Sequence, residues 1–148
     1  MINKVVVKVV NKSNNELPAY GTELAAGVDV RANIEDTITV HPLERVLVPT
    51  GLFVEIPAGY EIQVRPRSGM AINHGITVLN SPGTIDADYR GEIKVILVNL
   101  SNNAHTIQHG DRVAQMVLNK VENIEWEAVT ELSATVRQDG GFGHTGKK

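Results

Sequence analysis

Short apolar runs, rich in valine, isoleucine and threonine, dominate the hydrophobic pattern of this chain. Proline, glycine and asparagine residues separate the runs at short intervals, as in a chain that turns repeatedly between strands. Within residues 60–66, Ile62 and Val64 alternate with polar neighbours, which is the period of a strand with one buried face. The pattern predicts one all-β domain, a sandwich or a barrel. The predicted strands lie within residues 4–10, 36–40, 45–49, 51–57, 60–66, 91–100 and 111–120.

Helical patterns are scarce. Residues 68–75, "SGMAINHG", favour two helical turns, with Ser68 as the N-cap and Gly75 as the terminator. Residues 123–132 allow either a helix or a strand that leads into a loop. The chain shows no internal repeat and no interdomain linker before its glycine-rich tail. We therefore expect an all-β fold with at most one short helix.

Composition narrows the class of protein. A chain of 148 residues is long enough to bury a real core in one compact domain. A formal net charge of -3 argues against general affinity for nucleic acid or anionic membranes. The absence of cysteine excludes disulfides and cysteine-ligated zinc. Lysines interrupt the apolar N-terminus, so no signal peptide is expected, and no run approaches the ~20 apolar residues of a membrane span. We expect a soluble protein of the cytoplasm, or at least of the cell interior.

The tail "RQDGGFGHTG", residues 137–146, combines four glycines with an arginine and a phenylalanine. A P-loop is not expected, because Lys148 follows the Gly-Lys pair at positions 146 and 147, where a P-loop has Ser or Thr. The glycines would still let backbone N–H groups approach phosphate oxygens, and Arg137 could add a bidentate contact. Phe142 could stack on a nucleobase. The alternative, which composition alone favours, is a disordered tail.

Two further segments carry candidate chemistry. "RPRSG", residues 65–69, suits either an anion site or a capped helix whose arginines lie in solvent. "NSPGTIDADYRGEIKV", residues 80–95, is predicted to form a hairpin with acidic residues near its bend. In extended chain, Asp86 and Asp88 would share one face and Tyr89 the other. A carboxylate beside a phosphate ester can act as a general base for water. The alternative is that these acidic residues belong to a solvent-exposed turn without a catalytic role.

Isolated polar residues leave alternatives open. Asp29, within the apolar stretch "AAGVDVRA", needs partners or a metal if it is buried. Gln115, within "GDRVAQMV", could donate to an anion or to a neighbouring backbone group. His105 and His109 share a face but lack a third ligand nearby in the sequence, which argues against a metal site. No Ser-His-Asp triad is indicated.

In this order, the motifs at residues 25–32, 65–71, 80–95, 110–116 and 137–146 resemble those of the trimeric dUTP pyrophosphatases (dUTPases). Five ordered motifs carry far less risk of a chance match than one. The resemblance implies a jelly-roll-like fold and a homotrimer whose active sites are shared between subunits. It also implies hydrolysis of dUTP to dUMP and pyrophosphate, by attack of water on the α-phosphorus. Mg²⁺ would be held mainly by the substrate's phosphates.

The resemblance also implies individual roles. Asp86 would be the general base, and Tyr89 would pack under the deoxyribose and exclude a 2′-hydroxyl. Asp29 would act on the metal only through water or through the subunit contact, with no direct protein ligand to Mg²⁺. The other implied substrate-binding residues are Arg67, Ser68, Gly69 and Gln115 for phosphate, Asn80, Gly83, Thr84, Ile85 and Lys94 at the uracil pocket, and Arg137, Phe142, Gly143 and Thr145 in the tail.

The resemblance implies a β-domain, residues 1–136, and a flexible arm, residues 137–148, that closes over an active site, expected to be that of a neighbouring subunit. Two alternatives belong to other classes. A dCTP deaminase shares the architecture, but we would expect a catalytic glutamate in the context of Asp86. A non-enzymatic trimeric β-module would explain the strands but not the five motifs.

Overall fold

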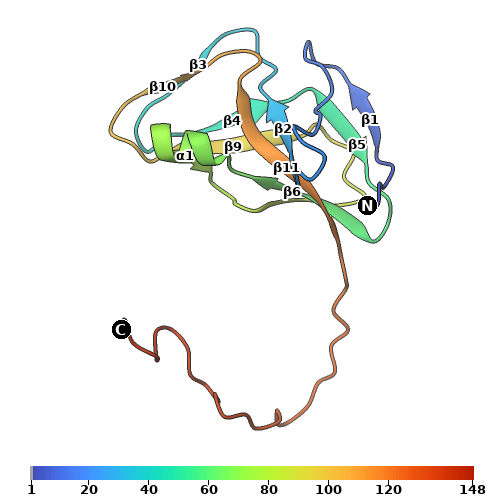
Figure 1. Cartoon of the computed structure of the whole chain (residues 1–148), viewed down its shortest axis with the longest axis vertical. Helices are drawn as coiled ribbons and strands as arrows, with labels where there is room; N and C mark the ends of the chain where they lie inside the picture. The colour runs from blue at the N-terminus through green and yellow to red at the C-terminus, as the bar shows by residue number, and fades with distance from the viewer. Residues whose placement is uncertain (1) are drawn as a thin grey trace.

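The structure is a computed structural model that describes residues 2–148. Within these residues the chain forms short strands and one short helix, which confirms the all-β prediction (Figure 1). In chain order the elements are β1 (Lys8–Asn11), β2 (Val28–Arg31), β3 (Ile38–Val40), β4 (Arg45–Pro49), β5 (Leu52–Glu55), β6 (Tyr60–Arg65), α1 (Ser68–His74), β7 (Ile76–Val78), β8 (Gly83–Ile85), β9 (Lys94–Asn99), β10 (His105–Ile107) and β11 (Arg112–Lys120).

The strands form two larger sheets and two strand pairs, and across residues 2–148 no sheet closes into a barrel. One sheet has the order β2-β11-β6-β8 and the other β4-β9-β7, while β1 pairs with β5 and β3 with β10. A single core cluster takes residues from both larger sheets, including Val30 and Val113 from one and Ile76 and Leu97 from the other. Burial of apolar surface between two sheets is the arrangement of a β-sandwich.

Strand β6 shows how the sequence pattern produces this packing. Ile62 and Val64 are buried, whereas Glu61, Gln63 and Arg65 are only partly covered. Because side chains alternate across a strand, one face of β6 faces the core and the other carries polar groups. The predicted alternation is therefore confirmed.

Helix α1 begins and ends as a consequence of its flanking backbone. Its predicted end at Gly75 is confirmed, since Gly75 adopts φ 64° and its N–H donates to the carbonyls of Met70 and Ala71. The prediction that Ser68 is the N-cap is wrong. Arg67 is the N-cap, because its carbonyl accepts the first helical hydrogen bond, from the N–H of Ala71 at 3.1 Å. Its backbone is extended, and its side chain makes no capping bond.

The prediction of a hairpin over residues 80–95 is also wrong, because the two strands of this segment do not pair with each other. Strand β8 pairs with β6, whereas β9 pairs with β4 and β7 in the other sheet. Residues 86–89 form a tight turn, closed by the N–H of Tyr89 and the carbonyl of Asp86 at 3.1 Å. Asp86 and Asp88 therefore do not lie along one extended strand. The two strands diverge, which opens a space between them.

The chain beyond β11 leaves the domain. Residues 122–148, the projecting segment, form neither helix nor strand and extend away from the sheets (Figure 1). Residues 123–132 thus adopt neither of the two predicted forms. The projecting segment starts before residue 137, where we expected the arm to begin. Separately, no helix within residues 2–148 has the length and hydropathy needed to cross a membrane.

Candidate active site

The divergence of β8 and β9 creates a cavity of about 360 Å³, here called the β8–β9 pocket. Strand β8 is an edge strand, and such strands present unpaired N–H and C=O groups. A planar heterocycle with its own donors and acceptors can pair with that edge, and the volume suits a small ligand. The pocket is lined by Leu47, Thr84, Ile85, Asp86, Tyr89, Glu92, Ile93, Lys94 and Ile96. Four of the residues expected at the base and sugar, Thr84, Ile85, Tyr89 and Lys94, line it together with Asp86, the expected general base.

Gly83 begins β8, and Asn80 lies in the turn that precedes it. A Cβ atom added at Gly83 would stand 3.2 Å from Nδ2 of Asn80 and 3.3 Å from Cβ of Val64. The absence of a side chain at Gly83 therefore lets the Asn80 amide approach the strand. The Asn80 side chain is placed beside the backbone that it was expected to assist.

Tyr89 is held by its own turn. Its hydroxyl donates to the carbonyl of Glu92 at 2.8 Å, which folds the ring back over Gly91. A Cβ atom at Gly91 would lie 2.6 Å from Cζ of the tyrosine ring, closer than packing allows. The ring thus forms a fixed wall of the β8–β9 pocket.

Asp86 is exposed and stands between two cavities. Besides the β8–β9 pocket, it lines an outer pocket of about 560 Å³ together with Tyr60, Glu61 and Asp88. Water therefore reaches its carboxylate from solvent. This position suits a group that must hold a water molecule against a substrate.

Arginines gather at a different part of the fold. Nε of Arg67 lies 3.1 Å from Oδ1 of Asp29, and Nη1 of Arg112 lies 3.5 Å from Oδ2 of the same carboxylate. Nη1 of Arg67 also donates to the carbonyl of Arg112 at 3.3 Å. Asp29 thus has the charged partners that a partly buried carboxylate needs. Arg65, in contrast, is held by the amide oxygen of Gln63.

Gln115 links strand β11 to the start of this region. Its Nε2 donates to the carbonyl of Pro66 at 3.0 Å, so its amide binds backbone, one of the two predicted alternatives. A Cβ atom at Gly27 would lie 2.7 Å from Oε1 of Gln115, and glycine there leaves room for this amide. Ser68 and Gly69 follow at the beginning of α1, both exposed.

A second cavity of about 360 Å³, here called the arginine pocket, adjoins these residues. Its lining is Arg31, Arg67, Met70, His74, His105, Gly110, Asp111 and Arg112. Three guanidinium groups against one carboxylate make the lining net positive, which favours an anion.

Two histidines meet in this pocket, but not the pair suggested by the sequence. The rings of His74 and His105 lie 4.6 Å apart, whereas Nδ1 of His109 accepts the N–H of Ile34 at 3.3 Å. Burial and the neighbouring His74 lower the pKa of His105, and Asp111 opposes that shift. Within residues 2–148 no three histidine, aspartate or glutamate side chains are grouped to hold a metal ion.

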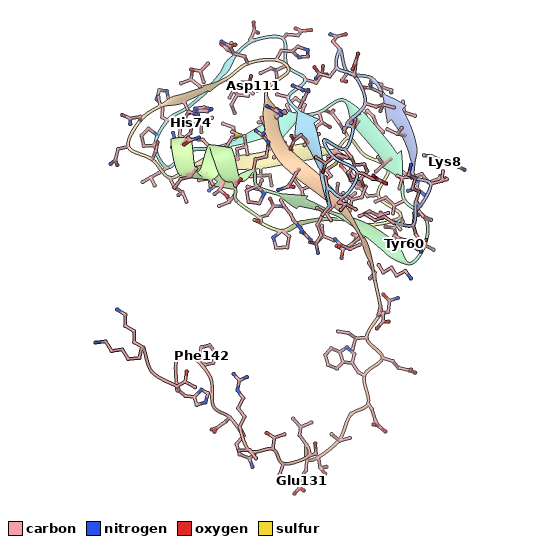
Figure 2. All side chains as sticks on the ribbon, in the orientation of Figure 1. Lys8, Tyr60, His74, Asp111, Glu131 and Phe142 are labelled. Atoms are coloured by element: carbon pink, nitrogen blue, oxygen red, sulfur yellow. The ribbon has the colours of Figure 1, made fainter. Side chains whose placement is uncertain are left out.

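The two pockets lie at opposite ends of the domain. Asp86 follows the Ile85–Ile62 pair and so stands beside Glu61, near the beginning of β6, whereas Arg67 follows the end of that strand. Six residues of mostly extended chain span roughly 20 Å. Figure 2 shows the same separation, with Tyr60 at one end of the domain and His74 at the other. One chain therefore does not bring Asp86 and Arg67 to the same ligand.

The tail residues are separate again. Phe142 is fully exposed on the projecting segment, far from both pockets (Figure 2). Nε of Arg137 donates to the carbonyl of Gly140 at 2.7 Å, and the N–H of His144 donates to Gly141 at 3.1 Å. The tail, which includes Gly143 and Thr145, is thus a series of tight turns. It does not contact the candidate residues of the β-domain.

Sequence patterns missed the residues that hold the turn at Asp86. Arg90 donates to two carbonyls of this turn, and Glu55 binds both Arg90 and Lys8. These residues come from three separate segments, so no local motif could have indicated their contact.

The fold and these two faces define a β-sandwich protein with a base-sized pocket at one end and a cationic pocket at the other. A family model described as dUTPase matches residues 13–146. The chain belongs to the dUTPase family.

Its relatives agree in length and sequence. The deoxyuridine 5'-triphosphate nucleotidohydrolase of Fusobacterium nucleatum subsp. nucleatum is 64% identical over 146 residues, which cover 99% of this chain and all of the relative. The protein of the same name from Finegoldia magna is 61% identical over 140 residues, covering 95% of this chain and 98% of the relative.

Solved structures agree in fold. The dUTPase of Staphylococcus bacteriophage 80alpha with dUPNHPP has a TM-score of 0.84 at 24% identity and covers 97% of this chain and 100% of its own. A mutant dUTPase from phage phi11 of S. aureus, described for the coordination of a structural Mg(II) ion, has a TM-score of 0.76 at 22% identity, covering 88% of this chain and 100% of its own. Both confirm the expected β-rich fold.

Proposed function

We propose that this chain hydrolyses dUTP to dUMP and pyrophosphate. The observation that carries the proposal is the β8–β9 pocket, where an edge strand, Tyr89 and Asp86 stand together in a chain of the dUTPase family. The reaction would limit incorporation of uracil into DNA and would supply dUMP for dTMP synthesis. Because its substrate and products are nucleotides of the cell interior, we expect it to act in the cytoplasm.

The residues of the β8–β9 pocket suit the base and sugar of dUTP. The free edge of β8, at Gly83, Thr84 and Ile85, offers backbone donors and acceptors to the uracil edge, assisted by Asn80. A deoxyribose would stack on the ring of Tyr89, and the hydrogen bond and Gly91 contact that hold the ring support its role in excluding a 2′-hydroxyl. Lys94, at the start of β9, lines the same pocket.

Asp86 is the proposed general base. Its carboxylate would take a proton from a water molecule as the water oxygen bonds to the α-phosphorus. The bond from that phosphorus to the oxygen bridging the α- and β-phosphates then breaks, and pyrophosphate leaves with the electron pair. The exposure of Asp86 at the border of the pocket allows water to reach it.

Phosphate groups would bind at Arg67, Ser68, Gly69 and Gln115. Arg67 is held by the Asp29 carboxylate and lines the arginine pocket. Asp29 is shared by two arginines, so it suits contact with a metal's water shell better than direct ligation. Mg²⁺ bound by the triphosphate would neutralise charge during the reaction, in keeping with its preference for substrate phosphates and water.

The distance between the two faces supports a homo-oligomer. The α-phosphate must contact Asp86's water and the phosphate-binding residues at once, yet these lie roughly 20 Å apart along β6 in one chain. A second copy can place its arginine pocket against the first copy's β8–β9 pocket. Exposed apolar side chains on the projecting segment, Ile124, Trp126, Val129, Leu132 and Val136, provide surface for such contacts. We propose a closed homotrimer.

The arm, residues 137–148, would complete the site from a neighbouring subunit. Phe142 would cover the uracil, Arg137 would meet the terminal phosphate, and Gly143 and Thr145 would close on the phosphates. The arm extends away from its own domain and Phe142 is fully exposed, so the arm is free to bind a neighbouring subunit. Ordering of the arm would expel water, as active-site lids do.

Release of pyrophosphate from dUTP, dCTP, dTTP and UTP, measured side by side with Mg²⁺, tests the proposal. We expect rapid release from dUTP and little from the other three. Ammonia release from dCTP would instead support a deaminase. No turnover of any nucleotide would overturn the proposal and favour a non-enzymatic module.

A further inference from the structure

The turn that carries Asp86 and Tyr89 is held by the side chain that follows it. Nη1 of Arg90 donates to the carbonyl of Ala87 at 2.7 Å and lies 3.3 Å from the carbonyl of Tyr89. The turn itself is closed by one backbone bond, from Tyr89 to Asp86. Arg90 therefore joins two carbonyls that would otherwise be free to rotate toward solvent.

Arg90 is in turn anchored to another part of the domain. Its Nη2 lies 3.5 Å from Oε1 of Glu55, at the end of β5. The other oxygen of Glu55 lies 3.2 Å from Nζ of Lys8, its cross-strand partner on β1. The Lys8 hydrogen bond, followed by the charges of Lys8 and Arg90, lowers the pKa of Glu55. One carboxylate thus connects the turn to the β1–β5 pair.

These contacts are too exposed to matter much for folding. The side chains of Arg90, Glu55 and Lys8 are 53%, 47% and 78% exposed, and ion pairs at such positions contribute little to stability. They also lie far from the arginine pocket, since Lys8 and His74 mark opposite ends of the domain in Figure 2. Their main consequence is therefore local, in the position of the turn.

We propose that Arg90 is a positioning residue for the reaction, with Glu55 as its anchor. By fixing the carbonyls of Ala87 and Tyr89, Arg90 sets the orientation of the Asp86 carboxylate and the position of the Tyr89 ring in the β8–β9 pocket. This inference rests on the proposed dUTP hydrolysis. In this proposal Arg90 acts through the turn and not by contact with the reacting atoms.

The experiment compares Arg90→Ala, Arg90→Lys, Glu55→Gln and the double variant Arg90→Ala with Glu55→Gln. Arg45→Ala, at an exposed arginine on β4, is the matched control. We expect Arg90→Ala to lower kcat for dUTP by about tenfold, since small misplacements of a reacting group are costly. It should also narrow the ratio of kcat/KM for dUTP over UTP, with KM for dUTP changing less than kcat.

The other variants separate positioning from structural loss. Arg90→Lys should recover part of kcat, because an ammonium can still donate to one of the carbonyls. Glu55→Gln should lower kcat and the dUTP/UTP ratio of kcat/KM, but by less than Arg90→Ala does. The double variant should match Arg90→Ala alone, because the two substitutions break the same chain of contacts. Arg45→Ala should equal the wild-type chain.

Wild-type kcat and sugar discrimination in Arg90→Ala would overturn the proposal, as would an additive double variant. A fall in kcat that follows a fall in Tm would do the same. Amide hydrogen exchange at Tyr89 tests the clamp without turnover. Faster exchange in Arg90→Ala supports it even if the wild-type chain fails to hydrolyse dUTP, and unchanged exchange contradicts it.

Discussion

Gly91 lies directly against the ring of Tyr89. The tyrosine hydroxyl bonds to the carbonyl of Glu92, and a Cβ atom at Gly91 would stand 2.6 Å from Cζ of the ring. The position of the aromatic wall in the β8–β9 pocket therefore depends on the absence of a side chain two residues away.

The Gly91→Ala variant should push the Tyr89 ring toward the sugar site. We expect kcat/KM for dUTP to fall, because an overpacked contact moves the ring or the turn. In Tyr89→Ala, kcat/KM for dUTP should also fall. The preference for dUTP over UTP should become smaller as well, since this variant removes the aromatic wall. Measuring both ratios distinguishes displacement from removal. If neither variant changes the dUTP/UTP ratio, the sugar is recognised elsewhere.

Asp86→Asn tests the proposed base. The amide keeps the size of the side chain and a hydrogen-bonding oxygen but does not accept a proton near neutral pH. Turnover of dUTP should fall by ~100-fold or more, the usual contribution of a general base. Binding of a non-hydrolysable dUTP analogue, measured by calorimetry, should stay near the wild-type value. Turnover close to wild type would remove Asp86 from the mechanism.

Asp29→Asn tests the ion pair behind the phosphate face. The carboxylate is shared by Arg67 and Arg112, so its loss leaves two guanidinium groups without their common partner. We expect a loss of about 1 kcal/mol in stability and a several-fold rise in KM for dUTP, with kcat less affected. Urea unfolding and steady-state kinetics check both. Asp36→Asn, at an exposed loop carboxylate, is the control.

The sequence predicted those elements whose pattern is local. The alternation of Ile62 and Val64 identified β6, and the apolar run at residues 45–49 matches β4. The failure over residues 80–95 has a physical reason. Two strands that pair with each other and two strands that diverge into separate sheets can have the same local sequence. The difference is decided by strand partners that lie far away along the chain.

The candidate site shows the same limit. Asp86, Tyr89 and Thr84 are near in sequence, and in the structure they line one pocket. The contact of Asp29 with Arg67 spans 38 residues. Nothing in either local segment specifies that partner, so the sequence could indicate only that Asp29 needed one.

His105 should make part of the stability depend on pH. Burial first, then the charge of His74, lowers its folded pKa below the ordinary 6.5, against the opposing charge of Asp111. The unfolded chain therefore binds the proton more readily, and stability present above pH 6.5 is lost as pH falls through the folded pKa. Arg31, Arg67 and Arg112 line the same pocket as His105.

His105→Gln should remove this contribution. Urea unfolding at pH 8 and pH 5 should show a smaller loss of stability on acidification than in the wild-type chain. His41→Gln, at an exposed histidine in a loop, should keep the wild-type pH dependence. Parallel curves for wild type and His105→Gln would contradict the assignment.

The last prediction tests the arm and the trimer together. A chain that ends at Val136 lacks Arg137 and Phe142 but keeps every strand, since β11 ends at Lys120. It should fold and assemble, yet it should be nearly inactive because no arm closes on the substrate. Asp86→Asn should be nearly inactive for a different reason, the loss of the base.

Refolding equal amounts of the two inactive chains together distinguishes an arm that acts on a neighbour from one that acts on its own subunit. In a closed ring with random mixing, a given β8–β9 pocket has an intact Asp86 in half the cases, and the subunit that supplies its arm is full-length in half. About a quarter of all sites should therefore regain both groups and hydrolyse dUTP. If the arm instead folds over its own subunit, no mixture unites them, because each chain lacks one of the two. Activity equal to that of the parents, with mixed trimers confirmed by native mass spectrometry, would exclude the neighbouring-subunit arrangement.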